Sequence, residues 1–108
     1  ITLRTGVSKD GLLIAREGRV VLDCGAYANS GPATAAIALQ MLAGPYRTPH
    51  YAYESVSVYT NKGSTGSFRA PAGPMGNFAV ESQIAKLVHI DARFHRHEPV
   101  PNRRYALL

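Results

Sequence analysis

The sequence predicts an α+β fold in which a small antiparallel sheet packs against two helices. Three observations indicate this class: an Asp-Gly turn between two β-prone stretches near the N-terminus, a further β-prone stretch over residues 51–59, and two apolar helical patterns. The expected order is strand, strand, helix, strand, loop, helix. With 108 residues, the chain has room for one small domain or for one piece of a larger one.

The first two strands are expected to form a hairpin. The turn segment Ser8-Lys9-Asp10-Gly11 separates residues 2–7 from a second strand that begins at Leu12. Residues 20–22 continue or follow this strand. Between them, Glu17-Gly18-Arg19 leaves a bulge and a second tight turn open as alternatives.

The first helix follows a small, polar loop over residues 25–32. Asn29 or Ser30 can cap its free backbone N–H groups, and Pro32 suits the first helical turn. Gly44-Pro45 ends the helix. Three apolar residues recur at helical spacing and are expected to form the buried face: Ala33, Ile37 and Met41.

Residues 51–59 are rich in Tyr and Val and are predicted to form the third strand. A glycine- and proline-rich loop follows, from Asn61 to about Gly76. Asn77 or the end of this loop opens the second helix, whose pattern decays after His89. The apolar stripe of this helix is Val80, Ile84, Leu87 and Val88.

The formal net charge is +5, and the basic residues gather after residue 85, where only Asp91 and Glu98 oppose them. These basic residues are Lys86, Arg93, Arg96, Arg103 and Arg104. A solvated, helix-ending face is the plainer interpretation. A small binding module for nucleic acid or an acidic partner is kept as the alternative function.

The cysteine, the histidines and the lengths of the apolar runs bear on disulfides, metal sites and membrane spans. The lone Cys24 cannot form an internal disulfide and is expected to be a small buried residue at the end of the second strand. His95 and His97 are poorly spaced for a metal site in either a strand or a helix, and His50 is expected at the surface. No apolar run approaches the roughly 18 residues of a membrane span, and no secretion signal is visible, so we expect a cytoplasmic protein. Because the chain opens with Ile1 rather than Met, we expect a fragment.

The segment from Tyr59 to Pro74, a strand end followed by a glycine-rich loop and a helix start, is the best candidate for a ligand-binding site. Its glycines let backbone N–H groups approach a ligand closely, and Arg69 adds planar donors. The helix N-terminus beyond Pro74 adds partial positive charge. These features favour an oxyanion, a phosphate or another electron-rich group, and an ordinary loop with a solvated arginine is the alternative.

Several short motifs, taken in order, resemble one family. They are Lys9-Asp10-Gly11, Asp23-Cys24-Gly25-Ala26-Tyr27, Gly44-Pro45-Tyr46, Tyr59-Thr60-Asn61, Gly66-Ser67-Phe68-Arg69-Ala70-Pro71, Gly73-Pro74 and Phe78-Ala79-Val80-Glu81. In these residues the chain resembles the large subunit of the molybdenum hydroxylases, which include xanthine dehydrogenase, aldehyde oxidase and carbon monoxide dehydrogenase. The resemblance implies that residues 1–88 are a fragment of the molybdopterin-binding domain and that residues 89–108 are a divergent basic tail.

The resemblance also implies roles for the loop residues. Phe68, Arg69 and Ala70 would bind the molybdenum–molybdopterin cofactor, with Arg69 near the metal through its backbone amide and its side chain. Pro71 would line the substrate pocket. No catalytic residue is implied in this chain, since the family's base is a glutamate near the far C-terminus of the large subunit. Glu81 is expected to be structural, bonded to backbone amides or to an arginine.

As an enzyme, the complete protein would be an oxidoreductase. The resemblance implies that it hydroxylates aldehydes or N-heterocycles with oxygen drawn from water, and that its electrons leave through iron–sulfur clusters, usually to a flavin. The chain lacks the cysteine spacing that such clusters require. We therefore expect iron–sulfur clusters and FAD on partner subunits or domains, a small-molecule substrate, and no activity from this chain alone. The cytosine dinucleotide form of the cofactor is one alternative. Two departures from the family pattern adjoin the site, Ala72 for glycine and Met75 for glutamine.

Overall fold

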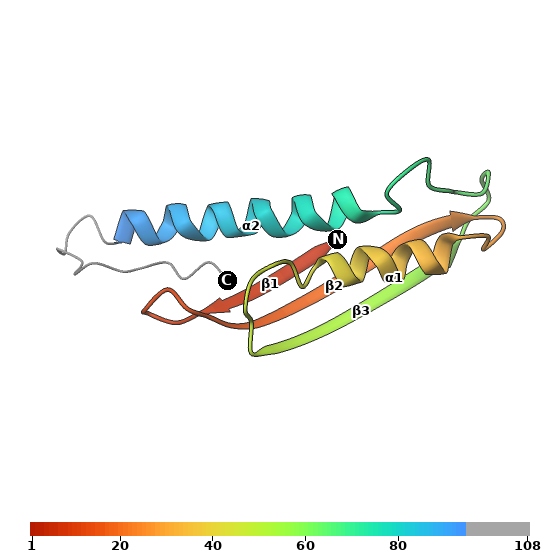
Figure 1. Cartoon of the computed structure of the whole chain (residues 1–108). Coiled ribbons are helices and arrows are strands. Elements are labelled where there is room, and N and C mark those ends of the chain that lie inside the picture. The colour runs from red at the N-terminus through yellow and green to blue at the C-terminus, as the bar shows by residue number, and fades with distance from the viewer. Residues whose placement is uncertain (95–108) are drawn as a thin grey trace.

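The computed structural model describes residues 1–94, which form three strands and two helices (Figure 1). In chain order these are β1 (Thr2–Val7), β2 (Leu13–Gly25), α1 (Gly31–Met41), β3 (His50–Tyr59) and α2 (Gly73–Phe94). The sheet has the order β1-β2-β3, and both helices lie over one of its faces. The predicted α+β class and element order are confirmed. Five of the histidine and arginine residues singled out in the sequence lie outside the described residues: His95, Arg96, His97, Arg103 and Arg104.

The hairpin prediction is confirmed, with one change of detail. β1 and β2 pair antiparallel, and the Gly11 amide donates to the Ser8 carbonyl at 3.0 Å to close the turn. β2 runs without interruption through residues 17–19, so neither the bulge nor the second turn considered there exists. The irregularity in register lies instead at Gly6/Val7.

The expectation of a wholly antiparallel sheet is wrong for the third strand. β3 pairs parallel to β2, with His50 opposite Ala15 at one end and Val58 opposite Asp23 at the other. A parallel neighbour requires a crossover connection, and α1 provides it. As a consequence, β2 and β3 end at the same edge of the sheet.

β2 is the central strand, and its side chains alternate between the two faces. Arg16, Gly18 and Val20 face the helices and are buried, whereas the odd-numbered residues between them are exposed. Gly18 has no room for a side chain, because a Cβ atom there would lie 2.7 Å from Cδ1 of Leu42. The core between the sheet and the helices consists of Val20, Ala38, Leu42, Ala72 and Val80.

The buried face of α1 differs from the prediction. Ala33 is exposed, and Ile37 and Met41 are only half-buried. The helix is apolar nearly all round, so its periodicity cannot select one face. Ser30 occupies the capping position but makes no side-chain capping hydrogen bond, and Asn29 makes none either. The buried residues of this helix are Gly31, Thr34, Ala35 and Ala38.

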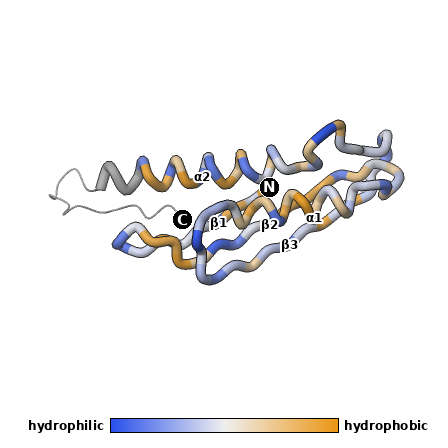
Figure 2. Tube along the Cα trace, viewed as in Figure 1, coloured by the Kyte–Doolittle hydropathy of each residue, from blue (hydrophilic) through white to orange (hydrophobic). Residues whose placement is uncertain are grey.

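α2 begins four residues before Asn77, since Pro74 suits the first turn of a helix. Hydrophobic and hydrophilic residues alternate along it (Figure 2). Val80 is buried as predicted, whereas Val88 is half exposed. Gly76 lets α2 approach α1 closely, because a Cβ atom there would lie 2.6 Å from Cβ of Met41. No helix in the described part of the chain is both long and apolar enough to cross a membrane.

A buried arginine ties the sheet to both helices. The Arg16 side chain is 2% exposed, and its Nη1 atom donates to the Leu42 carbonyl at 3.0 Å, just beyond the end of α1. Its Nε atom donates to Oγ1 of Thr5 at 3.2 Å, and Thr5 donates in turn to Gln83 of α2 at 2.6 Å. A cation at this position also suits the helix dipole of α1.

We expect Arg16→Ala to destabilise the fold by about 3 kcal/mol, because it opens a cavity and removes the donors that β2 presents to the end of α1. Chemical denaturation measures this change. Arg4→Ala is the control, since the Arg4–Glu17 ion pair is exposed on both sides and its loss should cost less than about 0.5 kcal/mol. Equal losses in the two variants would contradict the structural role of Arg16.

Candidate functional site

The loop between β3 and α2, residues 60–72, starts at the edge where the parallel strands β2 and β3 end (Figure 1). Loops at the carboxyl ends of parallel strands are the usual place for ligand binding. The connection from β2 to α1 lies beside the start of this loop. The Ala26 amide donates to the Lys62 carbonyl at 3.0 Å, and the Thr65 amide donates to the Cys24 carbonyl at 3.2 Å.

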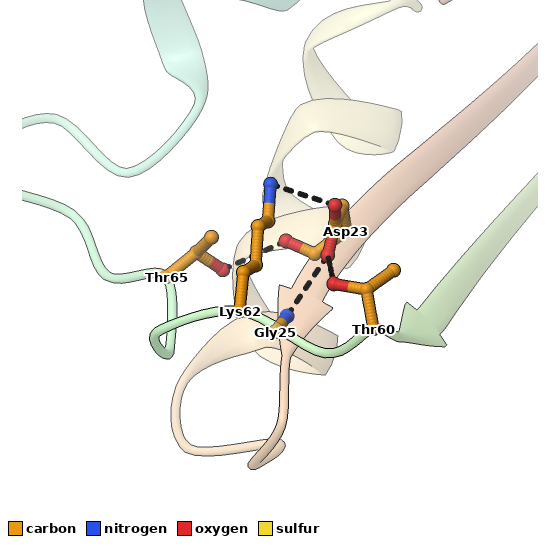
Figure 3. Close-up of polar contacts among 5 residues, drawn as sticks. All are labelled: Asp23, Gly25, Thr60, Lys62 and Thr65. Carbon is orange, nitrogen blue, oxygen red and sulfur yellow. Dashed lines mark hydrogen bonds and ion pairs between the residues drawn. The ribbon is translucent and has the colours of Figure 1, made fainter.

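The Asp23 carboxylate lies at the centre of this junction (Figure 3). Its Oδ1 atom accepts hydrogen bonds from the Thr60 hydroxyl at 2.5 Å and from the Gly25 amide at 2.9 Å. Its Oδ2 atom lies 2.6 Å from the Lys62 ammonium, and the Thr65 hydroxyl donates to the Asp23 carbonyl at 2.9 Å. We call these five residues the strand-end anchor.

The strand-end anchor was missed by the sequence analysis, which used Asp23 only as part of a family motif. A usable signal exists: Asp23 is a carboxylate directly after the apolar run of residues 20–22, at the end of a predicted strand. Apart from Gly25, the partners of Asp23 (Thr60, Lys62 and Thr65) are 37 or more residues away, so their convergence depends on the parallel pairing of β3.

Gly25 is required where the two segments cross. Its φ is +73°, and a Cβ atom there would overlap the Gly63 carbonyl oxygen and lie 2.9 Å from that of Lys62. By contrast, nothing lies within 4 Å of a Cβ atom built at Gly63, Gly66 or Gly73. Those three glycines leave open space beside the backbone, and their role in ligand approach stays a prediction.

The predicted cofactor- and substrate-binding residues lie together at the exposed tip of the loop. Phe68 is fully exposed, and Arg69, Ala70 and Pro71 are exposed as well. The Arg69 guanidinium makes no hydrogen bond or ion pair with any described residue. The backbone N–H groups from Gly66 to Ala70 also donate to no other described residue.

The far end of the loop is fixed in the core. The Gly73 amide donates to the Ala70 carbonyl at 3.0 Å and closes a turn over Pro71 and Ala72. Ala70 and Ala72 have φ values of 49° and 52°, a left-handed conformation that costs an alanine roughly 1–2 kcal/mol. Ala72 is 5% exposed and belongs to the hydrophobic core, and this burial holds the turn in place.

Glu81 has a different partner from the one predicted. It accepts a hydrogen bond at 2.6 Å from the hydroxyl of Tyr46, not from backbone amides or an arginine. This bond, with partial burial, raises the pKa of Tyr46. It links α2 to the segment that follows α1, which is a structural contact of the kind expected.

The remaining candidates for metal binding are dispersed. His50 lies exposed at the start of β3, and Cys24 is buried at the end of β2 as predicted. Among the described residues, no three His, Cys, Asp or Glu side chains come together in a way that could hold a metal ion. The assignment of Arg69 to the surroundings of molybdenum therefore rests on the family resemblance.

Comparison with known proteins decides the family. The sequence model of the molybdopterin cofactor-binding domain family matches residues 1–91 of the chain. The chain belongs to the molybdopterin cofactor-binding domain family. The resemblance read from the sequence motifs is thereby confirmed.

Relatives of this molybdopterin cofactor-binding domain belong to dehydrogenases. A probable xanthine dehydrogenase subunit of Bacillus subtilis (strain 168) is 41% identical over 81% of the chain, and the nicotinate dehydrogenase large molybdopterin subunit of Eubacterium barkeri is 37% identical over 78%. A putative xanthine dehydrogenase molybdenum-binding subunit of Escherichia coli (strain K12) is 38% identical over 73%. The matched region spans only 12%, 20% and 10% of the lengths of these three relatives.

Because the chain segments cross so closely at Gly25, a side chain at this position should lower the unfolding free energy of the domain. Gly25→Ala should destabilise it by about 3 kcal/mol, since the new methyl group overlaps the loop backbone and the residue has a positive φ. Gly63→Ala, in the same crossing but facing open space, should change the unfolding free energy by less than about 0.5 kcal/mol. Denaturant unfolding of both variants checks this, and similar values for the two would rule out the crossing as described.

The strand-end anchor should also make the unfolding free energy depend on pH. Hydrogen bonds from Lys62, Thr60 and the Gly25 amide lower the pKa of Asp23 from 3.8 to about 2. As the pH falls, the unfolded chain therefore binds a proton at this site before the folded chain does. The stabilising contribution of Asp23 is present above about pH 4 and is lost as the pH falls towards 2. Comparing the unfolding of wild type and Asp23→Asn from pH 6 to pH 2 should show a difference that shrinks with acid, and a constant difference would refute the assignment.

Proposed function

We propose that this domain contributes residues 66–71 to the cofactor pocket of a complete molybdenum hydroxylase subunit. The observation that carries this proposal is the exposed loop tip, where Arg69 and the N–H groups from Gly66 to Ala70 have no partner among the described residues, in a loop that starts at the carboxyl ends of two parallel strands. Family membership supports it. The proposed domain comprises residues 1–88, with residues 89–108 as a basic tail.

The donors of the loop fit the molybdenum–molybdopterin cofactor chemically. Such a group carries oxo, phosphate and heteroatom acceptors, and backbone N–H groups with a planar guanidinium are donors suited to all of these. Phe68, Arg69 and Ala70 would hold it, Arg69 through its amide and its side chain. When bound, the cofactor supplies the redox-active metal that lets an oxygen atom from water be added to a substrate carbon.

Pro71 would form part of the substrate wall. Its ring is apolar and rigid but not aromatic, so a flat substrate gains less from it than from stacking on Phe or Tyr. We propose an aldehyde or an N-heterocycle as substrate. Electrons would leave through iron–sulfur clusters to FAD, both carried by partner subunits or domains of a cytoplasmic enzyme. The cytosine dinucleotide form of the cofactor remains the alternative to the shorter one.

Arg69→Ala in the complete subunit, prepared with its partners, tests the proposal. The Arg69 side chain has no partner among the described residues, so its removal should leave folding unchanged. Activity per bound molybdenum should fall on the order of 100-fold, as for the loss of a preorganised donor in other active sites. Elemental analysis gives the molybdenum content, and steady-state kinetics give the activity.

Arg47→Ala is the matched control, since it removes the same charge from an exposed residue outside the loop. Its activity per molybdenum should equal that of wild type. If Arg69→Ala matched it in both molybdenum content and activity, the loop tip would have no part in the reaction and the proposal would be wrong.

A further inference from the structure

We propose that Asp23 is a positioning residue for Arg69. In this inference, which rests on the proposed function of the loop, the strand-end anchor fixes the start of the loop and thereby the place of its tip. Asp23 does not touch the cofactor or the substrate. It acts through the loop backbone that it holds at the end of β2.

The strand-end anchor holds the start of the loop through several hydrogen bonds and one ion pair. Asp23 uses both carboxylate oxygens and its carbonyl, and these accept from Thr60, Lys62 and Thr65 of the loop. Backbone hydrogen bonds from Ala26 to Lys62 and from Thr65 to Cys24 run beside them. Residues 60–65 are thus fixed relative to β2 by both side chains and backbone.

The loop tip follows the strand-end anchor closely in the chain. Only Gly66 and Ser67 separate Thr65 from Phe68, so the Phe68 Cα atom lies within about 11 Å of that of Thr65. The tip is also restrained by a 3.5 Å contact between the hydroxyls of Ser67 and Thr34 and, at its far end, by the turn that the Gly73 amide closes on the Ala70 carbonyl. A shift at Thr65 is therefore passed on to Arg69, and displacement by about 1 Å can cost a reaction 100-fold.

The positioning role of the strand-end anchor is distinct from its effect on the stability of the fold. The Lys62–Asp23 ion pair is exposed, with 55% and 36% of the two side chains accessible, and exposed pairs of this kind stabilise a fold little. The pair also neutralises the Asp23 charge, so the strand-end anchor adds no net repulsion to an anionic group at the loop tip. The positioning role therefore depends on the geometry of the strand-end anchor and is measured separately from its pH-dependent contribution to stability.

A double-mutant cycle in the complete molybdenum-containing enzyme tests the inference. Asp23→Ala should lower activity per bound molybdenum by 10- to 100-fold. In the Arg69→Ala background the same change should cost less than about 3-fold, because a residue that acts through Arg69 has nothing left to position. Glu54→Ala, which removes another exposed ion pair of the sheet, is the control and should leave activity unchanged.

A matched pair at Thr60 and a measurement independent of activity complete the test. Thr60→Val removes the hydroxyl that donates to Asp23 while keeping the side-chain shape, and Thr60→Ser keeps the hydroxyl. Thr60→Val should reproduce part of the Asp23→Ala loss, and Thr60→Ser should retain most of the activity. Hydrogen exchange of the segment 61–72 should become faster in Asp23→Ala and Thr60→Val but not in Thr60→Ser.

The outcomes separate this inference from the proposed function. If Arg69→Ala is harmless, the function of the loop tip fails and the positioning role fails with it. If Arg69→Ala is harmful but Asp23→Ala reduces only the molybdenum content, or reduces activity equally in both backgrounds, the positioning role alone is overturned. Unchanged hydrogen exchange in Asp23→Ala would overturn it as well.

Discussion

The crossing of β2 with the start of the β3–α2 loop is the constraint on which the candidate site depends. Asp23 pairs with Val58 in the sheet register, one residue before β3 ends at Tyr59, so its carboxylate reaches the chain that leaves β3. This is possible only because β2 and β3 are parallel and end at the same edge. In an antiparallel pair, Tyr59 would lie at the opposite end of β2, and Asp23 would meet the start of β3. The crossover through α1 therefore decides where the loop can be held.

The two ends of β2 serve different purposes. Towards its start, the buried Arg16 joins β1, the end of α1 and, through Thr5, α2, so that part of the strand holds the layers together. Towards its end, Asp23 is partly exposed, and its carboxylate binds the last residue of β2 and the start of the β3–α2 loop. Substitutions at Arg16 should therefore act on unfolding, whereas substitutions at Asp23 should act on the loop as well as on the pH dependence of unfolding. A single strand of 13 residues thus joins the layers near one end and holds the loop at the other.

Local signals in the sequence were sufficient to predict the helices and strands, but not to predict which of them pair or pack together. The Asp-Gly turn and the Tyr/Val pattern of residues 51–59 predicted the hairpin and β3 correctly, since both depend on neighbours in the chain. The parallel pairing of β3, the burial of Arg16 and the convergence on Asp23 depend on residues far apart, which periodicity does not report. For α1, a nearly uniform apolar composition concealed the face that Thr34 and Ala38 bury. The loop tip was found because the family motif, and not its physics alone, singled out Arg69.

The tip of the loop is held at both of its ends, so its residues determine the backbone turn as well as the exposed surface. Thr65 is bonded to β2 at one end, and Ala72 is buried in the core at the other. Between them, Pro71 stands second in a turn whose third residue, Ala72, is left-handed, and proline presets the φ that this turn position needs. Replacing Pro71 by an aromatic residue would therefore change the turn as well as the proposed substrate wall. Altered selectivity in such a variant can be assigned to stacking only if the hydrogen bond from the Gly73 amide to the Ala70 carbonyl is retained.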